Sequence, residues 1–318
     1  MKDILTLEMF YLVIGAIVAL VAGRIALDQD HPKRWGSAIF WGLLATVFIF
    51  GKVFPPLVAG YIVIAMCVLA ATGHVVPSNE KGSSREERSA EAERLDNGIF
   101  WPALLVPGTV ISWALWIKFG GYPFIDPKQG ALVSLGVGAM LALAVGMGIT
   151  GAAASEPIKE GSRLLQAVGW ALILPQLLAA LGGIFAQAGV GAVVADGVAR
   201  ALPTQFPIVA VAAYCGGMAL FTIVMGNAFA AFPVITLGIG LPLIVQQHHG
   251  NPAIMAALGM LSGYCGTLLT PMAANFNLVP ALLLELPDKH AVIKAQAPIA
   301  LVILAANVAL MYFCVFRF

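Results

Sequence analysis

Two interruptions of long apolar runs hold the residues best suited to bind a ligand. At the first, Gly226-Asn227-Ala228 divides an apolar run that continues past Pro233. At the second, a helix that runs into Thr270-Pro271 loses backbone hydrogen bonds at the proline, and Asn275 and Asn277 follow. Half-helix N-termini attract anions, and freed carbonyls with Thr and Asn oxygens coordinate sodium. We therefore predict that the two interruptions together line a site for a small anion.

The predicted site divides into two sets of residues. The substrate-binding set is Gly226, Asn227, Ala228, Thr270, Pro271, Ala274, Asn275 and Asn277, and the sodium ligands are Thr267, Thr270, Asn227 and Asn275. Pro233 is expected to help set the turn of the chain after the first interruption, and Pro271 to hold the second open. The alternative is that each motif is a kink or a helix-packing contact, because Gly and Pro are frequent in membrane helices.

Composition places these motifs in a membrane. The chain has 318 residues, of which 60% are hydrophobic and 10% charged, whereas soluble domains carry about 25% charged residues. The net charge is only +1, so no basic field is present to hold nucleic acid. Four cysteines stand singly in apolar runs, where they act as small apolar fillers. These values exclude a soluble enzyme and a disordered chain, and they predict a multi-pass integral membrane protein.

The apolar runs predict an all-α protein of about nine transmembrane helices plus a re-entrant hairpin and a broken helix. The expected parts are residues 1–76 as three spans, 77–98 as a polar cytoplasmic connector and 99–318 as a transport part, with the hairpin at 207–245 and the broken helix at 253–286. The candidate spans are Leu7–Leu27, Gly36–Phe54, Pro56–Val76, Ile99–Ile117, Gly130–Ala154, Leu164–Ala186, Pro207–Val224, Ala228–Val245, Ala253–Leu286 and Ala291–Phe316.

Lysine and arginine predict the orientation, because cytoplasmic loops carry an excess of both. If the loop with Arg24, Lys33 and Arg34 is cytoplasmic, eleven of the seventeen basic residues fall on that side. This count requires residues 207–245 to enter and leave the membrane on one side. The chain is accordingly expected in the inner (plasma) membrane of the cell.

The connector at 77–98 carries a local helix signal. Ser84 and Glu87 have the spacing of a capping box, and the Ala, Glu and Arg residues that follow favour helix. We expect a solvated helix here, with a partner-binding element as the alternative.

Enzymatic chemistry has little support in the sequence. No span carries an ionisable residue midway, and neither HExxH nor GxSxG occurs, so we expect no hydrolytic enzyme. His248 and His249 are adjacent, and on a helix their side chains point about 100° apart, which is poor geometry for one metal ion. Sodium is the only cofactor we expect.

The two interruptions resemble a pattern in a known superfamily. Gly226-Asn227-Ala228 with Pro233 is similar to the Ser-Asn-Thr hairpin signature of the ion-transporter superfamily, and the stretch 266–275 resembles the Thr-Pro…Asn break that follows it. The resemblance implies that tip and break hold a substrate carboxylate and sodium, which an elevator movement carries across. Gly226 and Ala228 replace the serine and threonine, and no second pair occurs in the N-terminal half. Either the first repeat has degenerated or a partner subunit supplies the other half-site.

Over nearly its whole length the chain also resembles the membrane family called domain-of-unknown-function 979. Residues 48–60 (FIFGKVFPPLVAG) and 174–191 (LPQLLAALGGIFAQAGVG) carry this likeness. The resemblance implies one subunit of a secondary transporter for a small organic carboxylate, associated with 5-oxoproline uptake and a smaller membrane partner. Two alternative hypotheses remain, a non-transporting scaffold subunit and an intramembrane enzyme. The enzyme needs a nucleophile–base pair, which the spans lack.

Overall fold

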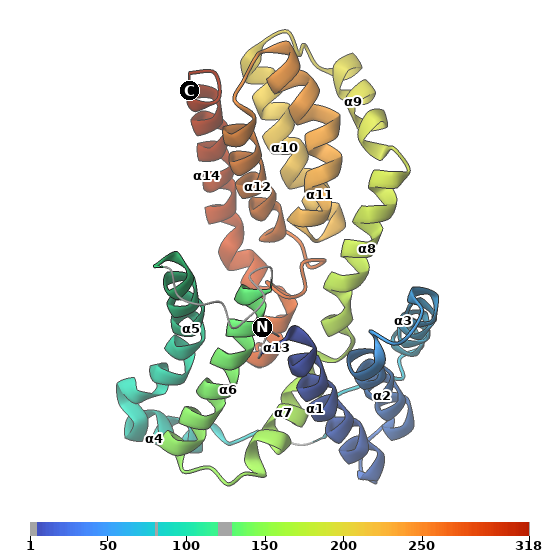
Figure 1. Cartoon of the computed structure of the whole chain (residues 1–318), viewed down its shortest axis with the longest axis vertical. Coiled ribbons are helices and arrows are strands. Elements are labelled where there is room, and N and C mark those ends of the chain that lie inside the picture. The colour runs from blue at the N-terminus through green and yellow to red at the C-terminus, as the bar shows by residue number, and fades with distance from the viewer. Residues whose placement is uncertain (1–4, 80–81, 120–128, 318) are drawn as a thin grey trace. The chain divides into compact units, whose positions relative to one another are not determined.

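The computed structural model describes residues 5–79, 82–119 and 129–317. These residues form helices and no β-strand (Figure 1), which confirms the all-α prediction. The chain divides into two compact units, Met1–Gly169 and Trp170–Phe318. We call them unit 1 and unit 2.

Unit 1 is built from helices that pack mainly in pairs. Helix α1 packs along α2, and α5 packs along α6. A Cβ atom on Gly138 of α6 would lie 2.2 Å from Thr109 Oγ1 of α5, so the missing side chain lets the two helices approach closely. The helices are α1 (Leu7–Leu27), α2 (Arg34–Phe50), α3 (Pro56–Ala71), α4 (Arg85–Leu95), η1 (Asp96–Ile99), α5 (Phe100–Lys118), α6 (Gly130–Thr150) and α7 (Glu156–Val168).

Polar contacts join the loop after α1 to two other parts of unit 1. Lys33 Nζ donates to the Gly73 carbonyl at 2.9 Å, and the backbone N–H of Lys33 donates to His31 Nδ1 at 3.1 Å. His31 Nδ1 is therefore the acceptor, and Nε2 carries the proton that it donates to Gln166 Oε1 at 3.0 Å. Gln166 in turn donates to Ser162 Oγ, and His31, Gln166 and Ser162 are all buried. This network fixes α7 against the loop.

The capping box predicted in the polar connector is confirmed. The backbone N–H of Glu87 donates to Ser84 Oγ at 3.1 Å, and the backbone N–H of Ser84 donates to Glu87 Oε2 at 2.8 Å. Both bonds satisfy first-turn donors that have no partner within the helix. Helix α4 begins directly after Ser84 and has no buried residue, apart from Arg85, whose surroundings lie outside the description.

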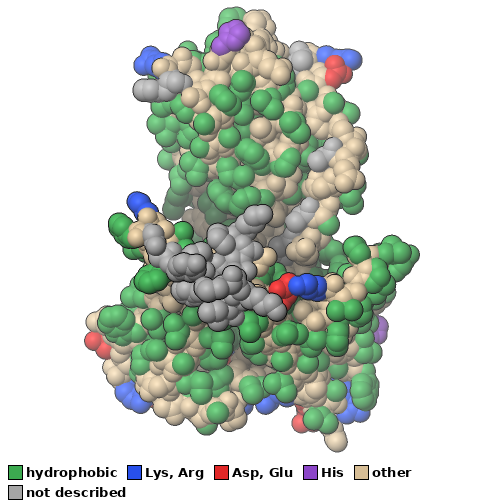
Figure 2. Space-filling model, viewed as in Figure 1, with side chains coloured by type: hydrophobic (Ala, Val, Ile, Leu, Met, Phe, Trp, Pro, Cys, Tyr) green, Lys and Arg blue, Asp and Glu red, His purple; other side chains and the backbone are tan. Residues whose placement is uncertain are grey.

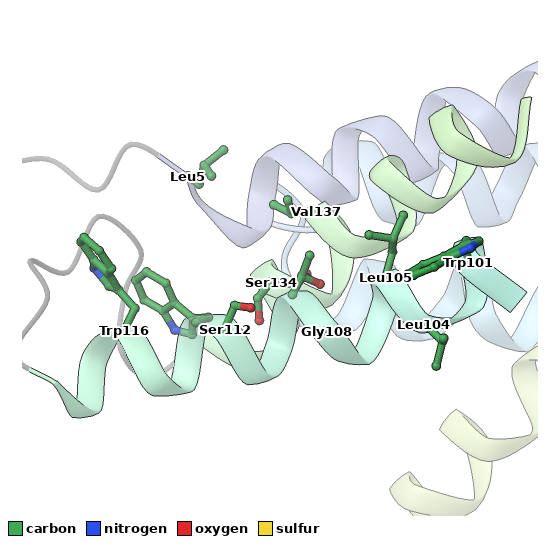
Figure 3. A pocket seen from close by; sticks show the side chains of 11 residues that line it. Leu5, Trp101, Leu104, Leu105, Gly108, Ser112, Trp116, Ser134 and Val137 are labelled. Atoms are coloured by element: carbon green, nitrogen blue, oxygen red, sulfur yellow. The ribbon is translucent and has the colours of Figure 1, made fainter. Parts of the chain in front are cut away.

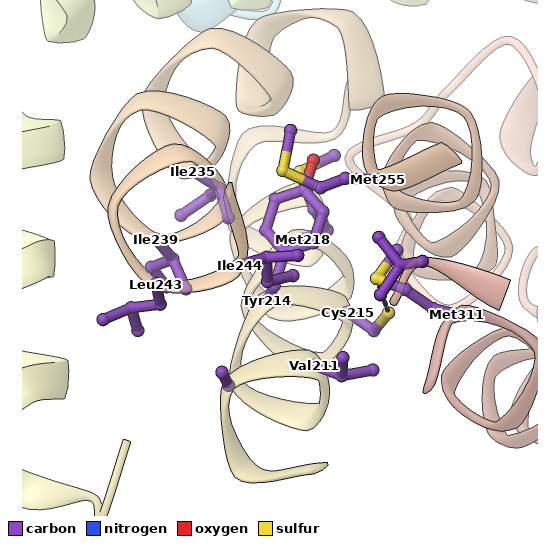
Figure 4. Close-up of a cluster of buried hydrophobic side chains, with 12 residues drawn as sticks. Val211, Tyr214, Cys215, Met218, Ile235, Ile239, Leu243, Ile244, Met255 and Met311 are labelled. Carbon is purple, nitrogen blue, oxygen red and sulfur yellow. Dashed lines mark hydrogen bonds between the residues drawn. The ribbon is translucent and has the colours of Figure 1, made fainter. Parts of the chain in front are cut away.

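Unit 2 is a bundle around one hydrophobic core. Helices α10, α12 and α14 pack against one another, and η3 packs against α10 and α12. Their core includes Tyr214, Cys215, Ile239 and Met311, with Cys215 Sγ 3.7 Å from Met311 Sδ (Figure 4). The helices are η2 (Gly169–Ile173, which starts at the last residue of unit 1), α8 (Leu174–Gln187), α9 (Val190–Ala201), α10 (Pro207–Met225), α11 (Ala228–Ile235), η3 (Thr236–Gln247), α12 (Pro252–Thr267), α13 (Leu278–Leu283) and α14 (Ala291–Cys314).

The element η3 is a π-helix of 12 residues. Such helices close each hydrogen bond one residue later than an α-helix and are usually limited to a single turn within an α-helix. Together α11 and η3 form one continuous run, Ala228–Gln247, that returns antiparallel to α10. Gly238 lies in this run against α9, where an added Cβ would be 2.4 Å from the Gly191 carbonyl oxygen.

Within the described residues, seven helical runs are long and apolar enough to cross a membrane. Ten candidate spans were expected, with the two hairpin arms counted separately, and three of them fall short because α2, α3 and α12 comprise only 17, 16 and 16 residues. The expected span at 164–186 is divided among α7, η2 and α8. Figure 2 shows hydrophobic side chains spread over the visible surface of each unit, with few charged ones. A multi-pass membrane protein accounts for such exposed apolar surface.

The two arms of the 207–245 hairpin are both among these seven runs. Their outer ends meet, because Gln247 Nε2 donates to the Thr204 carbonyl at 3.0 Å. Two full crossings return the chain to the side where it started, as a re-entrant hairpin does. The distribution of basic residues is therefore the same for both arrangements and does not favour either one.

Candidate functional site

The tip of the hairpin is formed by Gly226 and Asn227. Helix α10 ends at Met225, and Gly226 has φ +69°, a left-handed conformation that suits glycine. The backbone N–H of Gly226 donates to the Thr222 carbonyl at 2.7 Å. Asn227 Oδ1 accepts from the backbone N–H of Phe229 at 2.8 Å, which makes Asn227 the N-cap of α11.

The second interruption separates α12 from α13. Helix α12 ends at Thr267, and residues 268–277 follow without helix. Asn277 is fully buried, and its Nδ2 donates to the carbonyls of Thr267 at 2.8 Å and Thr270 at 2.7 Å. The Asn277 amide therefore satisfies one carbonyl at the end of α12, which has no partner within the helix, and one in the non-helical segment that follows.

The tip and the second interruption lie against each other in unit 2. Thr270 Oγ1 donates to the carbonyl of Ile223, in the last turn of α10, at 2.8 Å. A Cβ atom on Gly226 would lie only 2.6 Å from the Met272 carbonyl oxygen. Glycine at this position thus permits both the turn and the close approach of the two backbones.

The predicted residues differ in how closely they join this contact. Thr270, Asn277 and Gly226 take part directly, and Thr267 does so through its carbonyl, while its hydroxyl donates to the Tyr264 carbonyl at 2.6 Å. Ala228 and Ala274 are buried, whereas Pro271 and Asn275 are exposed. The structure brings together the members of the following set and leaves Asn275 outside it: Gly226, Thr267, Thr270 and Asn277.

Two buried oxygens here have no hydrogen-bond partner within the described residues. They are Thr222 Oγ1 and Asn277 Oδ1, both in fully buried residues. Thr222 lies one turn before Gly226 and faces α12, since an added Cβ on Gly266 would be 2.9 Å from Thr222 Cβ. A buried oxygen without a partner costs about 1–3 kcal/mol, so a cation or a water molecule at this point would be stabilised.

Sequence reasoning missed Thr222, Ile223 and Met272. The spacing of Thr222 from Gly226 was a usable signal, because a residue four positions before the end of a helix presents its carbonyl to that end. Ile223 contributes only its backbone carbonyl to the contact, and Met272 contributes its carbonyl and its backbone N–H, which donates to Thr270 Oγ1 at 3.2 Å. No side-chain pattern could have identified them.

The electrostatic character of this site comes from uncharged oxygen atoms and backbone dipoles. Residues 201–284 include no Asp, Glu, Lys or Arg. First-turn N–H groups of a helix have no partners within it and carry the positive end of the dipole, and those of α11 begin at Ala228 beside the tip. Such an arrangement can hold a small anion by backbone donors and a hard cation by amide, hydroxyl and carbonyl oxygens.

Metal chemistry by ionisable side chains finds no support in the part of the chain that the structure describes. There, no group of three or more His, Cys, Asp or Glu residues is placed to hold a metal ion. His248 Nε2 lies 2.9 Å from the Thr204 carbonyl, and His249 adopts φ +55° in the same turn.

Comparison with known proteins identifies a family. The family model described as "Protein of unknown function (DUF979)" matches residues 8–316. No curated protein matches the chain. No solved structure matches it.

Proposed function

The chain belongs to the DUF979 family, and on this basis we propose that it is a subunit of a secondary transporter for a small organic carboxylate. The contact between the tip and the second interruption carries the proposal. Two breaks in apolar helices lie against each other within a stretch free of charged residues. Non-helical backbone at membrane depth is tolerated only where it is buried in protein or lines a cavity, and carriers use it to bind substrates.

The substrate carboxylate would be held by backbone donors at the tip. The N-terminus of α11 supplies N–H groups and the helix dipole beside Gly226 and Asn227. The N–H groups near Ala274 and Asn275 are the second set that we assign to the anion. 5-Oxoproline, a small cyclic carboxylate, is the substrate we would test first.

Sodium is the coupling ion that the oxygen atoms here favour. The two oxygens without partners, Thr222 Oγ1 and Asn277 Oδ1, support a cation beside the end of α12. The Thr267 and Thr270 hydroxyls already donate within the protein. Thr270 Oγ1 also accepts from the Met272 backbone N–H at 3.2 Å, so one of its two lone pairs is left for a cation. In this proposal Asn277 and Thr222 join Thr267 and Thr270 as ligands, and Asn227 serves mainly as the cap of α11.

The wider assignment extends the same proposal. We place the protein in the plasma membrane. Within the transport part expected at 99–318, residues 207–247 and 252–283 would form the segment that an elevator movement carries across. A smaller membrane subunit would supply the half-site for which this chain has no second pair of breaks.

Uptake by reconstituted protein tests the proposal. Proteoliposomes with this chain, alone and with its suspected small partner, would be given radiolabelled 5-oxoproline with and without an inward sodium gradient. Asn277→Ala is expected to reduce sodium-driven uptake at least tenfold while membrane expression stays normal. The matched control is Asn251→Ala. Asn251 caps the N-terminus of α12 in the same way as Asn227 caps that of α11, but the proposed site lies at the opposite end of α12. Asn251→Ala should retain uptake.

The second candidate is a scaffold subunit whose partner holds the whole site. The hydrogen-bonded caps favour it, because Asn227 and Asn277 both satisfy backbone groups that any helix end must satisfy. Wild-type uptake in Asn277→Ala complexes would overturn the proposed site and favour the scaffold role. Absence of uptake with 5-oxoproline but uptake of another carboxylate would change only the substrate.

A further inference from the structure

Unit 1 contains a long apolar groove of its own. It has a volume of about 670 Å³ and runs along α5 beside α6 (Figure 3). Its polar lining is small, and the side chains of Trp101 and Trp116 are 62% and 51% exposed. The lining residues of α5 recur every three or four positions, so they form one face of the helix: Trp101, Leu104, Leu105, Gly108, Thr109, Ser112, Trp113 and Trp116.

The length of the groove suits one extended alkyl chain. From Trp101 to Trp116 the helix rises about 22 Å at 1.5 Å per residue. The same 22 Å corresponds to an extended chain of roughly 16–18 carbons at tetrahedral geometry.

Charge at the two ends of the groove indicates how such a chain would be oriented. Lys118 lies in the last turn of α5, two residues beyond Trp116, and Asp96 begins η1 at the other end. An anionic group is therefore attracted to the Lys118 end and repelled from the Asp96 end. The exposed Ser112 lies about 9 Å from Lys118 along the helix, near the depth at which a headgroup region of about 5–8 Å meets hydrocarbon.

The walls of the groove leave room at one glycine. An added Cβ on Gly108 has no atom of the protein within 4 Å, whereas Gly138 on α6 packs tightly on Thr109. The single proton of the Thr109 hydroxyl is shared between the Val106 and Ser134 carbonyls, which lie 2.8 Å and 3.1 Å from Oγ1. The Thr109 hydroxyl is thus satisfied within the protein, and the space over Gly108 stays open to a ligand.

We propose that the groove between α5 and α6 binds one acyl chain of an anionic phospholipid, with the phosphate beside Lys118. The chain fills the stripe from Trp116 to Trp101, and the Ser112 hydroxyl donates to the ester carbonyl. This site is independent of the proposed transport function and would be present in a scaffold subunit as well.

Lipid retention by the purified chain tests this site. The full chain would be reconstituted in vesicles of phosphatidylglycerol and phosphatidylethanolamine, extracted in mild detergent and examined by native mass spectrometry. One phosphatidylglycerol per chain is expected to stay bound. Gly108→Leu fills the groove and should reduce retention at least fivefold. Gly148→Leu is the matched control, because Gly148 on α6 also has no atom within 4 Å of an added Cβ and lies outside the lining.

The headgroup is tested separately. Lys118→Gln should lower the preference for phosphatidylglycerol over phosphatidylethanolamine at least threefold while leaving total retention near normal. Size-exclusion elution and helical circular dichroism identify variants that fail to fold, and Ser112→Leu provides a second filling variant. Retention unchanged in both filling variants overturns the site. A dimer that dissociates in Gly108→Leu, or a bound free fatty acid without phosphate, overturns the phospholipid assignment.

Discussion

Helices α5 and α10 have the same length of 19 residues but are packed very differently. In α10 eight residues are buried, and in α5 none is. The buried residues of α10 recur along one face from Ala210 to Met225, where α12 presents Gly259, Gly263 and Gly266. Helix α5 contacts mainly α6 and leaves its groove face open. Hydrophobicity thus makes both helices suitable for a membrane, while small residues on a neighbouring helix determine which one is buried.

This comparison predicts that two Gly→Ala substitutions with the same steric overlap lower the stability of the protein by different amounts in the two units. An added Cβ on Gly259 would lie 2.2 Å from Tyr214 Oη, and one on Gly138 would lie 2.2 Å from Thr109 Oγ1. Tyr214 is fully buried in the core, so Gly259→Ala should destabilise the protein by about 3 kcal/mol. In Gly138→Ala, α5 is free to move away, and we expect about 1 kcal/mol.

Chemical unfolding in detergent measures both variants. Gly216→Ala is the control in unit 2, since an added Cβ there meets nothing within 4 Å, and it should stabilise by about 0.5–1 kcal/mol. Equal losses in Gly259→Ala and Gly138→Ala would contradict the difference drawn between the two units.

The second effect in size belongs to the buried amide in unit 2. Asn277→Ala leaves the Thr267 and Thr270 carbonyls without their donor, which we expect to cost about 2 kcal/mol. Hydrogen exchange followed by mass spectrometry should show faster exchange confined to residues near 265–280. Protection unchanged in this segment would mean that water replaces the amide without loss.

In unit 1 the corresponding polar device is exposed and contributes less. Ser84→Ala removes the acceptor for the Glu87 N–H and should cost about 1 kcal/mol of helix stability. Because α4 is solvated, the loss should appear as faster amide exchange in residues 85–95 while the unfolding midpoint of the whole protein stays unchanged. A lower global midpoint in this variant would show that α4 is coupled to the rest of unit 1.

The smallest effect is expected at the loop before α14. Lys294 Nζ, by its hydrogen bond at 2.7 Å, and then the His290 backbone N–H lower the pKa of the exposed Asp288 carboxyl. A lowered folded-state pKa adds stability above the ordinary value of 3.8, and this stability is lost as the pH falls through the folded value. The difference in melting temperature between wild type and Asp288→Asn should be slight at pH 7 and vanish in acid.

The sequence predicted local features better than the contacts between them. The lengths of apolar runs indicated the helices, and the Ser84–Glu87 spacing indicated a cap that the structure confirms. The left-handed turn at Gly226 follows from a glycine between two apolar runs. The close approach of the Met272 carbonyl to Gly226 could not be predicted from the sequence, because it depends on how α10 and α12 pack and involves no side chain of Met272. The same limit applies to the groove beside α5, whose residues read as an ordinary apolar span.

The π-helix η3 determines where the hairpin can tolerate the deletion of one residue. Each hydrogen bond in a π-helix joins residues five apart, one residue more than in an α-helix. Deleting one residue from 236–247 can therefore be absorbed by converting a π turn into an α turn, with Asn227 and the outer end both kept in register. Deleting one residue from α10 instead rotates Gly226 by about 100° relative to the buried face. Among related sequences, single-residue deletions should therefore occur in the second arm of the hairpin and be rare in the first.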